Sequence, residues 1–304
     1  MFIKNSKLTT VLCIILSSLL FGIGLLYFIS ESNPKQASYV DLSNLYSKNA
    51  VLLELESGNI IAEKKSNKRI YPASLTKIMT SLVTLENCDD VYGTMTIPYE
   101  IFDSLYSEGA SMAGFMPGES VSAIDLVYGM LLPSGAECCL TAAYSISGSE
   151  EDFVELMNEK AEELGMNNTH FTNTTGLHNK NHYSTVSDLA KLTQYALQNS
   201  YFREVFTSQY HSVSPNEYHP EGFTFYSTIY EPLQSYEMVS GTILGGKTGY
   251  TDEAGLCLAS CASIGGYEYL LVTANAEGDH FTEQFNITDA VNVYNQIGSR
   301  NLID

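Results

Sequence analysis

Hydrophobic and polar residues follow two patterns along this chain, and together they predict an α/β protein. Apolar runs flank a Ser-Gly-Asn turn at residues 57–59, which is typical of a β-hairpin over 50–62. Residues 241–276 are punctuated by glycines and β-like, with Tyr267–Val272 as the clearest strand. Strands are therefore expected near both ends of the chain.

The segment between these ends predicts helices. Pro72 precedes apolar residues at helical spacing, so we expect a helix that contains Ser74 in its first turn. Further helices are expected at three internal segments and near the C-terminus: 121–132, 149–165, 187–198 and 282–297. Strands at both ends with helices between them favour an α/β (α+β) fold, with one antiparallel sheet that the helices flank.

The N-terminal pattern predicts a membrane anchor. Residues 8–30 carry no charge and are long enough to span a bilayer, and Lys4 and Lys7 precede them. Basic residues before a span favour a cytoplasmic tail at 1–7, a polar linker at 31–44 and an extracytoplasmic domain at 45–304. This corresponds to a single-pass membrane protein. A cleaved signal peptide is the alternative, but the run lacks a short apolar region that ends in small residues.

Charge and cysteine content narrow the class of function. The formal net charge of −20 argues against nucleic acid as a partner, because phosphate binding needs clustered cations. No His or Cys cluster has the spacing of a zinc site, so neither a metal nor a cofactor is expected. Most of the six cysteines are expected to be small buried apolar residues.

Two motifs carry the candidate chemistry. Ser74 lies three residues before Lys77, which places both side chains on one helix face, where the amine can take the seryl proton. Lys247, followed by Thr248 and Gly249, is the only lysine after residue 191. Ser32 and Lys35 have the same spacing as the first pair, but they lie in the expected linker.

These residues meet the needs of an acyl-transfer site. Lys77 must be neutral to act as a base, so its pKa must be lowered by burial or by a nearby cation such as Lys247. The backbone N–H groups of Ser74 and Tyr250 are candidate donors to an oxyanion. Glycines around Lys247 would let a substrate backbone pair with the strand edge.

The chain resembles the serine D-alanyl-D-alanine carboxypeptidases, the low-molecular-mass penicillin-binding proteins, from about residue 50 to 297. Beyond the two motifs, the resemblance rests on segments spread over this range: 71–77, 116–119, 131–135, 165–171, 176–177, 183–185 and 246–251. It implies a β-lactamase/transpeptidase-like fold.

The resemblance also implies residue roles. Ser74 would be the nucleophile, Lys77 its base and Ser134 a proton relay near the leaving amine. Lys247 and Thr248, with Gly249 and Tyr250 beside them, would bind the substrate, a peptidoglycan stem peptide that ends in D-Ala-D-Ala. Penicillins and other β-lactams would acylate Ser74.

One position departs from the family pattern. The second family motif is Ser-x-Asn, but Ser134 and Gly135 are followed by Ala136, and no Asn lies between Asn87 and Asn158. The loss of that amide removes a hydrogen bond of about 1–3 kcal/mol, which slows an enzyme without abolishing its activity. Glu137 adjoins the gap, but a carboxylate does not donate as an amide does.

Three functions remain open from the sequence. The first is a working carboxypeptidase, within which a transpeptidase differs only in its acceptor. The second is a weak or inactive binder of wall peptides, marked by Ala136. The third is a β-lactamase, but the chain has no Glu-x-x-Leu-Asn segment to supply a deacylating base, and residues 162–165 are its nearest fragment.

Overall fold

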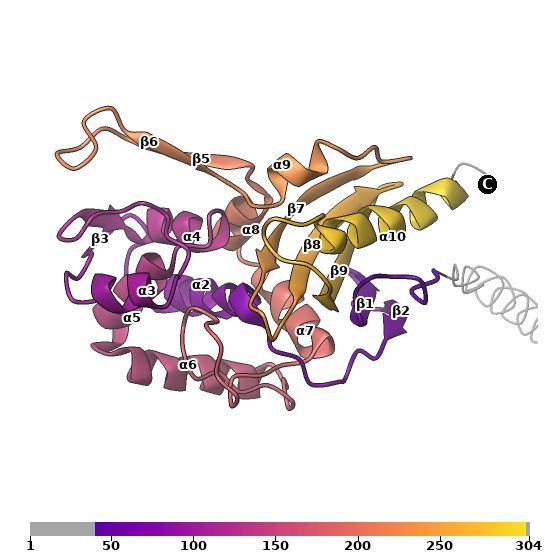
Figure 1. The fold of residues 1–304 in the computed structure, drawn as a ribbon, viewed down its shortest axis with the longest axis horizontal. Helices are drawn as coiled ribbons and strands as arrows, with labels where there is room; N and C mark the ends of the chain where they lie inside the picture. The colour runs from indigo at the N-terminus through magenta and orange to yellow at the C-terminus, as the bar shows by residue number, and fades with distance from the viewer. Residues whose placement is uncertain (1–39, 302–304) are drawn as a thin grey trace, which may run out of the picture. The chain divides into compact units, whose positions relative to one another are not determined.

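Segments from both ends of the chain form one antiparallel sheet. The computed structural model describes residues 40–301, and its sheet has the strand order β2-β1-β9-β8-β7 (Figure 1). Its strands are β1 (Asn49–Glu54), β2 (Ile60–Lys64), β7 (Thr242–Gly249), β8 (Leu256–Ile264) and β9 (Tyr267–Ala276). The N-terminal hairpin joins the C-terminal strands through β1 and β9, with Val51 opposite Val272. The predicted sheet is confirmed.

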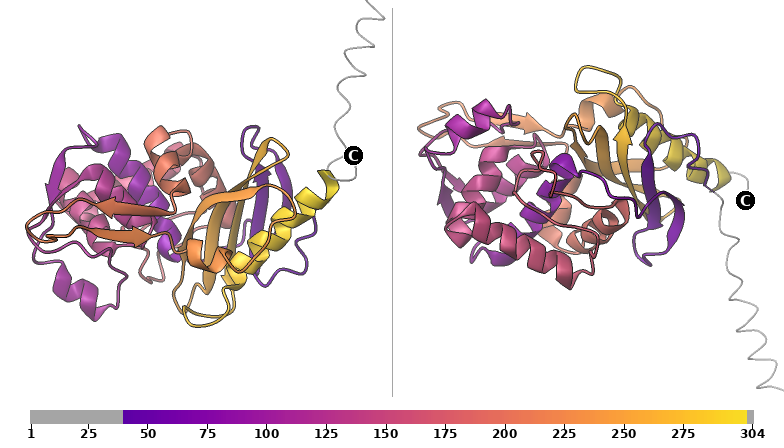
Figure 2. Two further views of the ribbon diagram at one scale, coloured as in Figure 1. Left: turned by 90° about the horizontal axis from the view of Figure 1, so that it is seen from above. Right: turned by 60° about the horizontal axis from the view of Figure 1, so that its bottom comes forward.

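Both faces of the sheet are covered, which explains the nearly continuous apolar runs of its strands. Alternate residues of β1 point to opposite faces. Leu52 packs in a cluster with Tyr294 of α10 (Phe285–Asn301), whereas Val51 packs in the cluster that contains the other helices. The helical region and the sheet lie side by side (Figure 2).

Helix α2 (Thr76–Asn87) runs through the centre of the helical region. All its residues from Thr76 to Leu85 are buried. Its buried polar side chains find hydrogen-bond partners, some of them in distant segments, as where the Thr80 hydroxyl donates to the Thr174 carbonyl at 2.6 Å. The surrounding helices are α3 (Phe102–Ser107), α4 (Ala123–Leu131), α5 (Ala136–Ser147), α6 (Glu150–Glu163), α7 (Val186–Ala196) and α8 (Ser200–Thr207).

The predicted helices are confirmed with bounds that shift by up to four residues, and side-chain caps explain where several of them begin. Ser122, Ser149 and Thr185 each accept a hydrogen bond from the backbone N–H three residues later, at the starts of α4, α6 and α7. The expected helix at 121–132 therefore starts later, because Ser120–Ser122 form strand β4, which pairs with β3 (Thr94–Thr96).

The sequence analysis did not predict α3, α5, α8 and the short helix α9 (Tyr230–Leu233), nor the hairpin of β5 (Tyr210–Val213) and β6 (Phe223–Tyr226). This hairpin lies over the helical region (Figure 1). Phe223 and Phe225 contact Phe115 on its inner face. Tyr210 and Tyr226 form an exposed cross-strand pair on its outer face.

The packed domain begins before residue 45. Val40 and Leu42, which fall in the expected linker, are 3% and 4% exposed and pack in the cluster that contains α10. The expected tail at 1–7 and span at 8–30 lie outside the described residues. Among residues 40–301, no helix has the length and apolar character needed to cross a bilayer.

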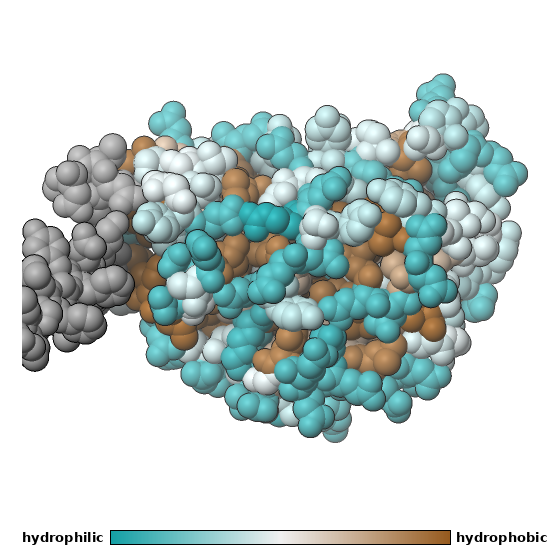
Figure 3. All heavy atoms as spheres, turned by 180° about the vertical axis from the view of Figure 1, so that it is seen from behind, coloured by the Kyte–Doolittle hydropathy of each residue, from teal (hydrophilic) through white to brown (hydrophobic). Residues whose placement is uncertain are grey.

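Hydrophilic side chains cover much of the face in Figure 3, with apolar ones in the recesses between them.

Candidate active site

The Ser74–Lys77 pair forms where α2 begins. The Nζ atom of Lys77 lies 3.1 Å from the Ser74 Oγ atom, as the spacing predicted. Ser74 itself lies in a 3-10 turn, Ala73–Leu75, that precedes α2 rather than in the first turn of the helix. Ala73 has a φ of 47°, and the backbone of Gly176 packs so closely on it that a Cβ there would lie 1.9 Å from the Ala73 carbonyl oxygen. This contact fixes the turn that carries the hydroxyl.

Lys77 is placed in an environment that favours a neutral amine. Its side chain is 2% exposed, and its Nζ atom also donates to the Thr175 carbonyl at 2.6 Å. Burial lowers the pKa of Lys77, while the charges on Cys139 and Glu137 oppose that shift. Of the two causes that the sequence left open, burial is therefore the one that acts on Lys77. An amine with a lowered pKa can accept the Ser74 proton.

Lys247 lies inside the protein on β7, with no exposed surface, and its Nζ atom donates to the Thr248 carbonyl at 2.9 Å. Burial lowers the pKa of Lys247 well below its ordinary value, and the charge on Lys77 lowers it further. A charge on Lys77 therefore disfavours a charge on Lys247. A bound anion would restore the charge on Lys247.

The end of β7 lies directly against the Ser74 turn. A Cβ atom at Gly249 would lie 3.0 Å from the Ser74 nitrogen and 3.2 Å from the Pro72 oxygen, so any other residue would force the strand and the turn apart by a few tenths of an ångström. The approach brings the backbone of Gly249, the residue before Tyr250, close to the Ser74 N–H group. The N–H groups of Ser74 and Tyr250 remain the candidate donors to an oxyanion there.

The side chain of Tyr250 points to other partners. Its hydroxyl donates to Asp252 at 2.7 Å, and its ring packs edge-on against His280. The hydrogen bond to Asp252 raises the pKa of Tyr250 to about 12. The backbone of Tyr250, rather than its side chain, is thus available to the site.

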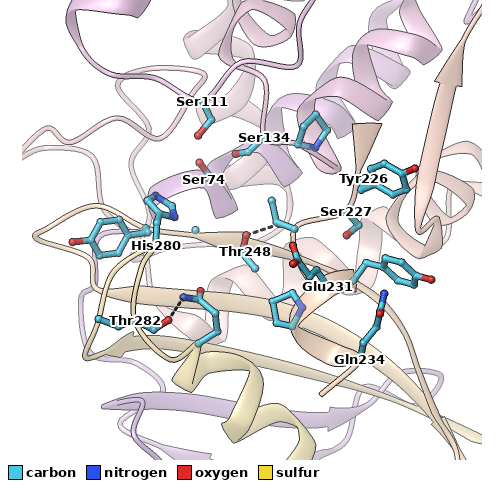
Figure 4. A pocket seen from close by; sticks show the side chains of 17 residues that line it. Ser74, Ser111, Ser134, Tyr226, Ser227, Glu231, Gln234, Thr248, His280 and Thr282 are labelled. Carbon is cyan, nitrogen blue, oxygen red and sulfur yellow. Dashed lines mark hydrogen bonds between the residues drawn. The ribbon is translucent and has the colours of Figure 1, made fainter. Parts of the chain in front are cut away.

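Ser134 occupies the turn between α4 and α5. Its φ is 71°, a left-handed conformation that is uncommon for a residue with a Cβ and is often found at active sites. The side chain is 6% exposed, and its hydroxyl has no hydrogen-bond partner among the described residues. It lies beside Ser74 in the cleft (Figure 4).

Ala136 begins α5 and is buried, so no amide occupies the Asn position of the motif. Glu137 does not fill it. One carboxylate oxygen of Glu137 instead accepts the N–H groups of Ala113 and Gly114, at 2.7 and 2.9 Å. Burial raises the pKa of Glu137, and these hydrogen bonds oppose the shift.

A cleft of about 690 Å³ opens over the paired residues. It is lined by Ser74, Ser111, Pro133, Ser134, Tyr226, Ser227, Thr228, Tyr230, Glu231, Pro232, Gln234, Thr248, Gly249, Tyr250, His280, Thr282 and Gln284. The lining comes from six separate segments of the chain, which surround the cleft in Figure 4. The Thr248 hydroxyl lies 2.6 Å from that of Thr228, a residue that the sequence analysis missed. No sequence motif marks the missed residues Ser111, Thr228, Glu231 and His280.

A helical region and an antiparallel sheet that meet at a Ser–Lys pair and a Lys-Thr-Gly strand define the class of active-site-serine, penicillin-binding proteins. The comparison with protein families gives the same result in finer detail. The chain belongs to the D-alanyl-D-alanine carboxypeptidase family Peptidase_S11, which matches residues 33–278.

Known members of the family are similar over most of the chain. The D-alanyl-D-alanine carboxypeptidase DacF of Bacillus subtilis is 35% identical over 263 residues, which are 86% of this chain and 66% of that protein. DacC of Escherichia coli is 28% identical over 275 residues, which are 87% of this chain and 65% of that protein. The chain thus spans just under two thirds of the length of these two relatives.

Solved structures have the same fold. The Streptomyces K15 DD-transpeptidase superposes with a TM-score of 0.76 and 26% identity, over 84% of this chain and 98% of that one. A D-alanyl-D-alanine carboxypeptidase from Mycobacterium tuberculosis gives a TM-score of 0.75 and 25% identity, over 86% and 95%.

Proposed function

We propose that this protein is a serine-type D-alanyl-D-alanine carboxypeptidase that removes the terminal D-Ala from peptidoglycan stem peptides. The observation that carries the proposal is the Ser74–Lys77 contact of 3.1 Å, with a buried amine whose pKa is lowered. The family and the names of its relatives support the same reaction.

The first half of the reaction forms an acyl-enzyme. The Ser74 Oγ atom attacks the carbonyl carbon of the D-Ala–D-Ala bond while Lys77 takes its proton. The N–H groups of Ser74 and Tyr250 stabilise the oxyanion. When the C–N bond breaks, a proton passes through the Ser134 hydroxyl to the leaving amine and D-alanine departs.

The second half regenerates the enzyme. Water attacks the ester carbonyl and gives up a proton to Lys77. Lys77 then passes this proton to the Ser74 oxygen as the ester bond breaks and the shortened peptide leaves. The same route explains acylation by β-lactams, whose strained amide opens on Ser74 and whose leaving amine stays tethered. A β-lactamase is not favoured, because the chain has no Glu-x-x-Leu-Asn segment to supply a deacylating carboxylate.

The substrate is held along the open edge of the sheet. Strand β7 is the last strand in the order, so its outer edge can pair with an extended peptide. We expect Thr248, which lines the cleft, and Lys247, which is buried next to it on β7, to bind the terminal carboxylate on the leaving-group side. Gly249 and Tyr250 lie against Ser74, beside the acyl residue.

We also propose that residues 8–30 anchor the protein in the cell membrane with residues 45–304 outside the cytoplasm. The uncharged sequence of this segment and the lysines before it support the proposal. Membrane fractionation and protease treatment of intact cells test it. Protection of the folded domain from external protease would contradict it.

The experiment that tests the activity is D-alanine release from a stem pentapeptide by the full-length chain, with Ser74→Ala as the control. Release that disappears in the variant is the expected result. A folded wild-type protein that releases no D-alanine would contradict the proposal. Addition of a D-amino acid acceptor to the same assay separates hydrolysis from transfer, because transfer yields a new peptide.

A further inference from the structure

The helical side of the cleft lacks the hydrogen-bond donor that the family motif provides. A peptide bound along β7 has amide groups on both edges, and the groups that face away from β7 need partners across the cleft. Ala136 supplies none. Four lining residues belong to this side: Ser74, Ser111, Pro133 and Ser134.

Ser111 is the one serine among these four residues that has no role in the proposed mechanism. Ser74 is the nucleophile, Ser134 is needed by the leaving amine, and Pro133 has no donor. The exposed Ser111 side chain lies above Ser74 and Ser134, and its hydroxyl points into the space that they share (Figure 4).

The loop that carries Ser111 is fastened to the start of α5. The Ser111 carbonyl accepts the N–H of Ala136 at 2.8 Å. Glu137, which has no exposed surface, accepts the N–H groups of Ala113 and Gly114. These three hydrogen bonds hold the loop on the same turn that carries Ser134. The Ser111 backbone is therefore held beside Ala136, which keeps the Ser111 side chain at this side of the cleft.

We infer that Ser111 is a substrate-binding residue whose hydroxyl donates a hydrogen bond to the amide carbonyl of the acyl residue, in place of the amide missing at position 136. The inference rests on the proposed function, since it assigns a contact within the same site. The Ser111 hydrogen bond explains how the site can hold the acyl residue although Ala136 replaces the Asn of the motif.

A comparison of two penicillins distinguishes a direct contact between Ser111 and the substrate from a role of Ser111 in the fold of the site. Benzylpenicillin carries an acylamino group that presents such a carbonyl, whereas 6-aminopenicillanic acid lacks it. The experiment measures the rate of Ser74 acylation by mass spectrometry in the full-length protein, for wild type, Ser111→Ala and the surface control Ser120→Ala. We expect Ser111→Ala to slow acylation by benzylpenicillin about tenfold and to leave that by 6-aminopenicillanic acid unchanged.

Other outcomes overturn the inference. An equal loss with both penicillins would show that Ser111 only supports the fold of the site, and no loss with either would show that it makes no contact. A folded wild type that neither penicillin acylates would contradict the proposed function and the inference together.

Replacement of the missing amide gives an independent test. The Ala136→Asn variant restores the side-chain amide of the family motif as a hydrogen-bond donor. Removal of the Ser111 hydroxyl should therefore slow acylation less in this variant than in the wild type. We expect Ser111→Ala to slow acylation by benzylpenicillin no more than about twofold in that background. A tenfold loss in both backgrounds would overturn the inference. If Ala136→Asn does not fold, the comparison of the two penicillins still decides the matter.

Discussion

The carbonyl oxygen of Thr175 lies 2.6 Å from the Lys77 amine, which also contacts the Ser74 hydroxyl at 3.1 Å. A neutral amine keeps two N–H groups and one lone pair. Because Thr175 takes one N–H group, it fixes the rotation of the amine and helps to direct the lone pair towards the Ser74 hydroxyl. Thr175 thus prepares Lys77 to act as a base without carrying a charge of its own.

The lowered pKa of Lys77 predicts the pH dependence of acylation. The neutral amine is the base, so the acylation rate rises with pH through the pKa of Lys77 and levels off below the ordinary lysine value of about 10.4. The measurement is the rate of Ser74 acylation by benzylpenicillin between about pH 5 and about pH 10. Lys77→Arg, which stays charged, should lower that rate by about 10²–10⁴. A rate that is independent of pH over this range would contradict a role for Lys77 as base.

The contact between β7 and the Ser74 turn makes Gly249 sensitive to substitution. In Gly249→Ala the new Cβ would lie 3.0 Å from the Ser74 nitrogen, so the strand must move away and the two oxyanion donors separate. We expect acylation to slow by about 10²–10³ while circular dichroism shows an intact fold. Acylation at the wild-type rate would show that the close approach is not needed for catalysis.

The pairing of Ser74 with Lys77 could be predicted from sequence because it is local. Helical spacing alone brings two side chains three residues apart to one face. The strands near Lys247 could be predicted too, since glycines and apolar runs mark them. Helix α5 could not, because its residues from Ala136 to Ala143 are all buried and show no periodic alternation of polar and apolar positions.

The rest of the cleft depends on tertiary contacts that no local pattern encodes. Ser111 reaches the site because Ala136 and Glu137 hold its loop, and these residues lie more than twenty positions away. Thr228 reaches it because β6 ends above β7. Serine and threonine in loops are too common for either position to stand out in a single sequence.

The hydroxyl pair of Thr228 and Thr248 predicts a substrate-binding effect. Thr228 orients the Thr248 hydroxyl from 2.6 Å, so Thr228→Val should weaken binding of the terminal carboxylate. We expect kcat/KM for D-alanine release to fall about fivefold, through KM more than kcat. Thr224→Val, which removes the hydroxyl contact with Ser212 on the exposed face of the hairpin, is the matched control. Equal losses in the two variants would contradict a specific role for Thr228.

His182 predicts how stability depends on pH. It is 2% exposed; its Nδ1 atom accepts the N–H of Thr172, and its Nε2–H can donate to the Thr76 hydroxyl at 2.8 Å. Burial lowers the pKa of His182 to about 3.

Because the unfolded chain binds a proton near pH 6.5 and the folded chain does not, His182 removes stability as the pH falls from about 6.5 towards about 3. At pH 7 we expect His182→Gln to be about 1 kcal/mol less stable, since it loses the acceptor for Thr172. Between about pH 6.5 and about pH 5, however, the wild type should lose about 2 kcal/mol more stability than the variant. Urea unfolding at both pH values measures this, with the exposed His280→Gln as control. Parallel losses in wild type and His182→Gln would show that another group causes the acid sensitivity.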